Sequence, residues 1–150
     1  MLLSGKFTLQ APIQQIWDLI LNPETATSCM PGCLEAKAID EKNFVATVQQ
    51  KVGSISATFR FTTTLTEVNP PTHLKAVGKG EEMSKAATFT HQTVVDLKET
   101  SEAVVEVSYR SNVRIVGRLS IFGDRIMTAK AKEVEEEFTQ ALKKKLSARI

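Results

Sequence analysis

The hydrophobic pattern of the chain changes its period once, and this change limits the folds that the chain can adopt. From Cys33 to Val113 apolar and polar side chains alternate, which predicts consecutive antiparallel strands with one apolar face. From Gly117 to about Leu146 apolar residues recur in steps of three and four, which predicts one long helix. Its apolar stripe comprises Leu119, Phe122, Ile126, Met127, Ala131, Val134, Phe138, Ala141 and Leu142. Because a sheet with one apolar face needs a cover, we expect this helix to lie across that face.

The segment before the alternating region predicts one strand and two short helices. Residues Ser4 to Gln10 alternate as a strand, and Pro12 suits the first turn of a helix. Asn22-Pro23 ends that helix, and a second short helix ends at Pro31-Gly32. We therefore predict a single α+β domain over residues 1–150. Its seven-stranded antiparallel sheet has two short helices between strands one and two and the long helix at the end.

Turn residues divide the alternating region into strands. Gly53-Ser54 supplies a tight reversal that makes a hairpin, and Asn69 to Thr72 and Lys79 to Glu82 are further predicted turns. The alternation then assigns one face of each strand to the helix. The larger side chains on this face are Phe59, Phe61, Phe89, His91 and Tyr109.

Composition excludes several classes of function. A net charge of +2, without a Lys/Arg block interleaved with aromatic residues, argues against nucleic-acid binding. The basic C-terminal group of Lys143, Lys144, Lys145 and Arg149 favours a helix end that complements the dipole over contact with a membrane or an acidic partner. The sequence shows no long apolar span and no signal peptide, so we expect a cytoplasmic location.

Motifs that carry catalysis or bind metal are missing from the sequence. Cys29 and Cys33 lie four residues apart without a third ligand nearby, which predicts neither a zinc site nor a disulfide. The sequence has no phosphate loop, no nucleophile elbow and no His-Glu-x-x-His, and Glu133 and Glu135 to Glu137 are interpreted as a solvated run of charge. We therefore expect no metal and no cofactor, and a binding role rather than an enzymatic one.

Two polar residues on the face assigned to the helix leave two interpretations open. His91 is either a hydrogen-bonded core residue or a group that contacts a ligand carbonyl or acts as an acid or base. Tyr109 has the same parity, and its hydroxyl needs a partner once it is buried. The other histidine, His73, follows a turn and is expected to be solvated.

Local motifs spread over the whole chain resemble one family. These are Gly5-Lys6-Phe7, Ala11-Pro12, Ile16-Trp17, Met30-Pro31-Gly32-Cys33, Lys51-Val52-Gly53-Ser54-Ile55, Gly117-Arg118-Leu119, Phe122-Gly123 and Ile126. Together with the order of elements, they resemble the CoxG-like family (the G subunit of carbon monoxide dehydrogenase) of the START-like helix-grip superfamily. The resemblance implies a curved sheet that grips the long helix, with an apolar cavity between them for a lipid-like or other hydrophobic molecule. It also implies an accessory role beside molybdenum hydroxylases, including membrane attachment and handling of a quinone-like molecule.

The candidate site follows from the predicted faces and this resemblance. The predicted ligand-binding residues are Phe59, Phe61, Phe89, His91, Tyr109, Phe122, Ile126 and Met127. Met30, Pro31, Gly32 and Cys33 form either a rigid corner or a gate at the cavity mouth. Gly117 and Gly123 are small residues at the long helix; Gly117 precedes it and Gly123 permits close packing, or both bend the helix and open the cavity.

Three hypotheses about function result. The first is a non-catalytic carrier of a hydrophobic small molecule. The second is an enzyme of the cyclase or hydratase kind that uses His91 and Tyr109 in the same cavity. The third is an assembly module that docks on an oxidoreductase, which is compatible with the first. The oligomeric state does not follow from the sequence.

Overall fold

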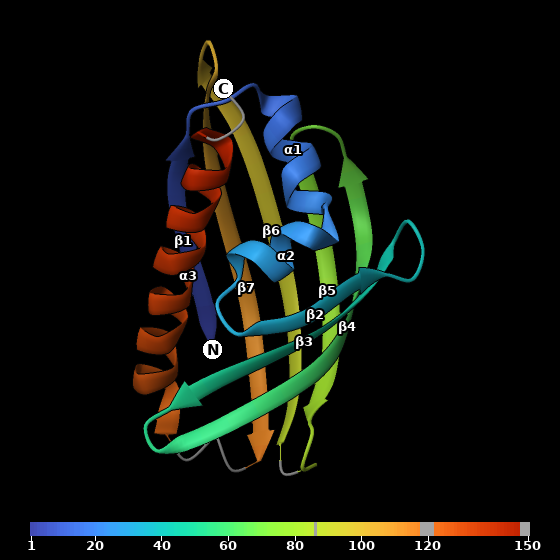
Figure 1. Ribbon diagram of the computed structural model, residues 1–150, viewed down its shortest axis with the longest axis vertical. Helices are drawn as coiled ribbons and strands as arrows, with labels where there is room; N and C mark the ends of the chain where they lie inside the picture. The colour runs from blue at the N-terminus through green and yellow to red at the C-terminus, as the bar shows by residue number, and fades with distance from the viewer. Residues whose placement is uncertain (86, 118–121, 148–150) are drawn as a thin grey trace.

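The alternating region forms six strands that, with the N-terminal strand, make one seven-stranded antiparallel sheet in the computed structural model (Figure 1). The structure describes residues 1–85, 87–117 and 122–147. The strands are β1 (Leu2–Leu9), β2 (Cys33–Ala38), β3 (Asn43–Val52), β4 (Ile55–Asn69), β5 (His73–Glu82), β6 (Ala87–Ser101) and β7 (Val104–Gly117). The helices are α1 (Ile13–Leu21), α2 (Pro23–Cys29) and α3 (Gly123–Ser147). The predicted fold class is confirmed.

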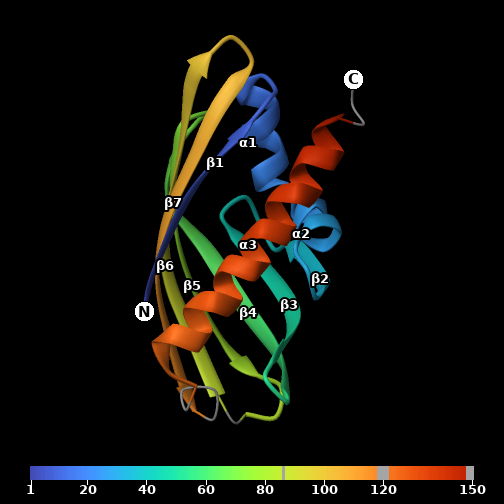
Figure 2. The same cartoon turned by 90° about the vertical axis from the view of Figure 1, so that its left-hand side faces the viewer.

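The strand order places β1 and β2 at opposite edges of the sheet. Strands β2 to β7 follow one another as a meander, and β1 pairs with β7 at the far edge, Leu9 opposite Val105. The chain therefore crosses from one edge of the sheet to the other through α1 and α2. Register shifts in β4 and β6 mark bulges, which bend a sheet locally. Figure 2 shows the curved sheet with all three helices on its inner face.

The main cluster of buried apolar side chains lies at one end of the inner face, which we call the core end; at the other end Val52, Ala57 and Ala87 are also buried. The main cluster lies beside the β4–β5 and β6–β7 turns and beneath α1, and contains Leu9, Ile16, Trp17, Leu19, Leu65, Leu74, Leu97, Val105, Leu142 and Leu146 among others. The buried residues of α3 are Thr139, Leu142 and Leu146, all in its C-terminal third. At this end Lys145 Nζ also donates a hydrogen bond to Ser28 Oγ of α2 at 3.0 Å. The helix is thus anchored at its C-terminal end.

The start of the long helix differs from the prediction. Strand β7 continues to Gly117, because the alternation extends through Val113 and Ile115, and α3 begins at Gly123. Neither glycine lies in the interior of the helix, so the prediction that they bend the helix is wrong. A Cβ at Gly123 would meet nothing within 4 Å, so the prediction that Gly123 permits close packing is wrong too. The φ of +74° at this position explains why glycine is favoured there. Leu119 lies outside the described residues.

The segment from Met30 to Cys33 forms a tight corner between α2 and β2. Gly32 has a φ of +79°, and a Cβ there would lie 1.9 Å from the Gln49 carbonyl oxygen of β3. The Gln49 N–H donates to the Gly32 carbonyl at 2.8 Å, and Gln50 Nε2 donates to the Pro31 carbonyl at 2.5 Å. Since these bonds tie the corner to β3, the geometry agrees with the rigid-corner interpretation. The gate stays a prediction.

Replacing Gly32 by alanine tests this corner. We expect Gly32→Ala to lower the free energy of unfolding by roughly 2 kcal/mol or more, because strain at positive φ adds to a backbone clash. Gly123→Ala is the matched control, since it carries a similar φ of +74° without any clash and should cost only about 1 kcal/mol. Urea denaturation followed by circular dichroism measures both. Equal losses for the two variants would show that the Gln49 contact does not constrain the corner.

Candidate ligand-binding site

An aromatic cluster lies on the inner face at the end opposite the core, which we call the distal end. The Phe59 and Phe89 ring centroids are 6.0 Å apart, those of Phe61 and Phe89 5.9 Å, and those of Phe89 and His91 5.8 Å. These rings are tilted relative to one another, as is usual for aromatic pairs. All four side chains are half-buried and none belongs to the buried core. Four of the predicted site residues are thus brought together.

Two glycines of β5 make room for this cluster. Gly78 pairs with His91, and a Cβ at Gly78 would lie 2.2 Å from the His91 Nε2. Gly80 pairs with Phe61 and Phe89, and a Cβ there would lie 2.4 Å from the Phe61 Cβ. The rings can therefore lie close over the β5 backbone.

The predicted turn from Lys79 to Glu82 is wrong. Strand β5 runs on to Glu82, and the turn begins at Met83. Glycine is common in turns, but the inward glycines here allow side chains of neighbouring strands to approach the backbone. The spacing of Gly78 and Gly80, two residues apart on one strand face, is the signal that could have identified them.

A chain of hydrogen bonds runs across three strands beside the aromatic cluster. His91 Nε2 lies 3.3 Å from Thr63 Oγ1 of β4, and His91 Nδ1 lies 2.9 Å from Thr93 Oγ1. Thr93 Oγ1 in turn lies 2.8 Å from Ser111 Oγ of β7. Burial lowers the pKa of His91, so the neutral ring, with one nitrogen as donor and one as acceptor, is favoured. The predicted inward orientation of His91 agrees with these contacts, and both ring nitrogens already have protein partners.

The second predicted polar residue, Tyr109, contacts α3. Its hydroxyl forms a hydrogen bond with Glu135. Burial is the larger cause that raises the pKa of Tyr109, and the Glu135 carboxylate is the second. Gly5 of β1 lies beneath the pair: a Cβ there would lie 2.5 Å from Glu135 Oε1 and 2.9 Å from the Tyr109 hydroxyl oxygen. Gly5 thus allows α3 to approach the sheet where Glu135 meets Tyr109.

Glu135 is a residue that the sequence interpretation missed. The run of charge to which it belongs is predicted to be solvated, but Glu135 is half-buried and faces the sheet. A signal is present in the sequence, because Met127, Ala131 and Glu135 follow one another in steps of four along one helix face. The position of Glu135 on the helix therefore predicts that it faces the sheet better than its charge does.

The N-terminal half of α3 completes the distal end. Phe122 lies against the β3–β4 hairpin, where a Cβ on Gly53 would be 3.4 Å from its Cε1 atom, and Met127 is half-buried. Ile126, a member of the predicted apolar stripe, is 47 % exposed, so the sheet does not cover the helix at this position. Met83, in the β5–β6 turn at the same end, is 62 % exposed. The core stops short of this part of the helix, which leaves apolar side chains accessible to solvent.

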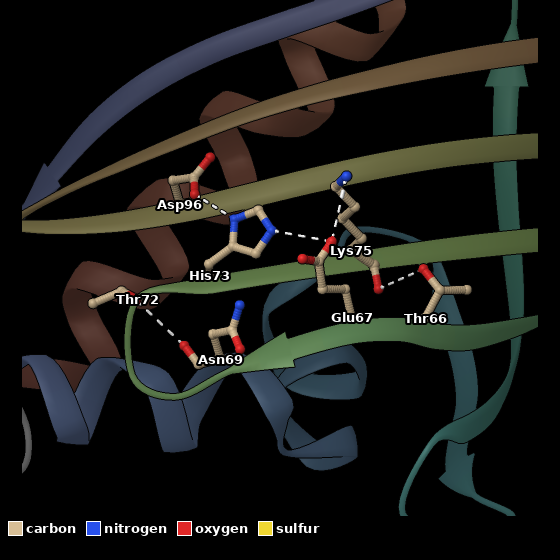
Figure 3. A network of polar contacts seen from close by, with 7 residues as sticks. All are labelled: Thr66, Glu67, Asn69, Thr72, His73, Lys75 and Asp96. Carbon is tan, nitrogen blue, oxygen red and sulfur yellow. Dashed lines mark hydrogen bonds and ion pairs between the residues drawn. The ribbon is translucent and has the colours of Figure 1, made fainter.

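His73 belongs to a separate network on the outer face of the sheet (Figure 3). Its Nδ1 lies 2.6 Å from Asp96 Oδ1, and its Nε2 lies 3.6 Å from Glu67 Oε2. Lys75 Nζ lies 3.3 Å from the same Glu67 oxygen. The Asp96 hydrogen bond is the main cause that raises the pKa of His73. His73 lies at the surface, as expected after a turn, and its side chain in addition joins β4, β5 and β6 at the core end.

The remaining predicted features have simple surroundings. Cys29 is buried and Cys33 half-buried, and both are free thiols. Burial raises the pKa of Cys33. Within residues 1–85, 87–117 and 122–147, no group of acidic, histidine or cysteine side chains is arranged to hold a metal ion. None of the helices described is long and apolar enough to cross a bilayer.

The family of the chain follows from its similarity to known proteins. Residues 5–147 match the family model of the carbon monoxide dehydrogenase G subunit (CoxG), so the chain belongs to this family. Among curated protein sequences, none is significantly similar to it.

Solved structures show the same fold at low sequence identity. A conserved protein of Geobacillus kaustophilus is 20 % identical, with a TM-score of 0.90 over 99 % of this chain and 96 % of that one. A START superfamily protein of Mycobacterium smegmatis is 11 % identical, with a TM-score of 0.76 over 99 % of both chains. A Thermus thermophilus protein is 7 % identical, with a TM-score of 0.73 over 99 % of both chains. The fold is therefore START-like.

The single tyrosine of the chain permits a direct test of the Glu135 contact. We expect Tyr109 to ionise well above the ordinary value of about 10, in an absorbance titration at alkaline pH. Because the raised pKa favours the protonated phenol in the folded state, its contribution to stability is lost as the pH rises beyond that ordinary value. Glu135→Gln should lower the midpoint only in part, since burial remains the larger cause. A wild-type midpoint near the ordinary value would contradict the contact.

The pKa values of the two histidines should be shifted in opposite directions from the ordinary value. In a proton NMR titration, we expect His73 above and His91 below the ordinary value of about 6.5. The stabilisation by His73 is complete below that value and is lost as the pH rises through its folded pKa. The folded state disfavours protonated His91, so stability falls as the pH drops below the same value. Asp96→Asn should move the His73 midpoint alone; movement of His91 as well would mean that the two sites are coupled.

Proposed function

We propose that the chain is a non-catalytic carrier that holds a hydrophobic, lipid- or quinone-like small molecule between the inner face of the sheet and α3. The observation that carries the proposal is the half-buried cluster of Phe59, Phe61, Phe89 and His91, which the core leaves accessible. Membership of the CoxG family and the START-like fold support it. Covering apolar surface contributes roughly 25 cal/mol per Å², so an apolar ligand gains by binding there.

The polar groups of the site suit an uncharged ligand. The hydrogen-bonded chain from Thr63 through His91 to Ser111 offers hydroxyl groups beside the aromatic rings. Neutral His91 supplies no positive charge, and Glu135 adds a carboxylate on the α3 side. A carbonyl or hydroxyl group is therefore favoured over a carboxylate or phosphate in this environment. Phe122, which directly precedes α3, and Ile126 and Met127 of α3 complete the proposed ligand contacts.

A carrier accounts for the polar contacts better than an enzyme does. The alternative of a cyclase or hydratase requires His91 and Tyr109 to act on one reacting atom. Both ring nitrogens of His91 have hydroxyl partners, whereas the Tyr109 hydroxyl forms a hydrogen bond with Glu135. These separate partners favour a structural role for both side chains.

The proposal includes a partner and a place in the cell. We assign the carrier an accessory role beside a molybdenum hydroxylase of the carbon monoxide dehydrogenase type, consistent with its family. In this proposal it acts in the cytoplasm, in peripheral contact with the inner face of the membrane. Docking on the oxidoreductase is compatible with carrying a ligand, because the two roles need different surfaces.

Ligand binding can be tested with two variants of neighbouring threonines. Thr63 faces the inner side of β4 and Thr62 the outer side, so Thr63→Trp fills the proposed site and Thr62→Trp is its matched control. We expect wild type and Thr62→Trp to bind a decyl-substituted benzoquinone in calorimetry, and Thr63→Trp to bind it about tenfold more weakly or worse. Palmitate should bind more weakly than the quinone.

Two results of this experiment would contradict the proposal. Equal affinity of both tryptophan variants would place the quinone elsewhere on the protein. Absence of binding by the wild type, together with native mass spectra that show no co-purified apolar molecule, would overturn the carrier role. Circular dichroism of each variant checks that the fold is intact.

A further inference from the structure

Three cations at the core end of the outer face are paired. Lys6 lies 3.9 Å from Glu106, and Lys75 and His73 belong to the network with Glu67 and Asp96. Lys98, on the outer face at the same end, is exposed and forms no ion pair with the described residues. Toward the distal end the outer face carries the cations Arg60, Lys79, Arg110 and Arg114. None of these four forms an ion pair with a carboxylate of the described residues. Glu81 is the acidic residue among them, opposite Arg60 in the register.

The strand register places two of these cations in one row. Thr62 pairs with Lys79, Lys79 with Thr90, and Thr90 with Arg114, so the row crosses β4, β5, β6 and β7. The row lines a surface hollow of about 610 Å³, in which Lys79 and Arg114 flank the shorter Thr90 side chain. A second hollow of about 630 Å³ shares Thr62, Lys79 and Thr90 and extends toward Met83. Together they form a shallow basic depression on the face away from the helices.

Exposed apolar side chains border this depression. Val77 is 39 % exposed, Val116 51 % and Leu2 69 %. Val77 is in the lining of the first hollow, and Leu2 pairs with Asn112, which lines it too. Thr62, Thr90 and Asn112 add hydroxyl and amide groups to the lining of the first hollow. Apolar, hydrogen-bonding and arginine side chains in one patch are typical of a protein–protein interface.

The same patch suits a membrane surface less well. Peripheral membrane binding uses protruding apolar or aromatic side chains that enter the headgroup region. The linings of the two hollows include the rings of His91 and Phe89, and both of these side chains face the inner side of the sheet. The apolar members are Val77, Val113, Met1 and Met83. Cations around a hollow complement carboxylates that project from a partner.

We propose that the outer face centred on Lys79 and Arg114 docks an acidic surface of a partner protein, and that this partner is the molybdenum hydroxylase. This inference rests on the proposed function, which it extends by assigning the docking surface. Binding on the outer face leaves the aromatic cluster and α3 on the other face uncovered. A ligand can then enter or leave the inner face while the partner stays bound.

Charge reversal at the two cations tests this surface. The probe is the purified carbon monoxide dehydrogenase-type hydroxylase from the same source, immobilised for biolayer interferometry at low and high salt. We expect Lys79→Glu with Arg114→Glu to weaken binding at low salt by about tenfold or more, mainly through slower association. The wild-type affinity should fall as salt rises, and the variant should depend less on salt. Lys98→Glu with Lys132→Glu is the matched control, since it makes the same change of charge at exposed positions away from the depression.

The outcomes separate this inference from the proposed function. Loss of binding in the Lys79/Arg114 variant, with the control unchanged and benzoquinone affinity retained, supports the docking surface. Equal binding by both variants and the wild type overturns it and leaves the partnership intact. Failure of the wild type to bind the hydroxylase overturns both the partnership and this surface, whereas the carrier role is judged by benzoquinone binding alone.

Discussion

The packing of the C-terminal third of α3 against the core determines how the rest of the inner face is used. Leu142 and Leu146 belong to the main buried cluster, at the end of the helix that contacts α2, whereas no residue is fully buried in the described part of α3 before Thr139. One helix anchored at one end cannot bury the whole length of a long curved sheet. The aromatic residues at the distal end therefore remain half-buried as a consequence of where the helix is held.

Small residues shape the inner face as much as large ones do. Gly5 lets Glu135 approach Tyr109, and Gly78 and Gly80 let His91 and Phe61 lie over β5. Each glycine removes a Cβ that would overlap a neighbouring side chain or backbone. Glycine weakens a strand on its own, so two in one strand are balanced by the contacts that they permit.

The periodicity of the sequence predicted which face of each strand points toward the helix, but it did not predict how closely the helix follows the sheet. Alternation placed Phe59, Phe89 and Tyr109 on the side that the structure assigns to the helix, and the element order with its motifs indicated the fold. The start of α3 and the exposure of Ile126 could not be predicted, because a stripe of apolar residues does not tell how far a helix follows the sheet. Glu135 was missed because a charge on an apolar stripe is interpreted as solvated unless its tyrosine partner is known. The hydrogen bond of His91 with Thr63 reaches across β5 from β6 to β4, and no local pattern contains this pairing.

Alternation along β4 has an evolutionary consequence. Thr62 lines the outer depression and Thr63 contacts His91 on the inner face, so consecutive codons specify two unrelated surfaces. A substitution in this strand changes one surface and leaves the other intact, which allows the two to diverge separately among relatives. Insertion or deletion of one residue exchanges the faces of every following position in the strand. Length changes should therefore be rare in β4, whereas point substitutions on either face are tolerated independently.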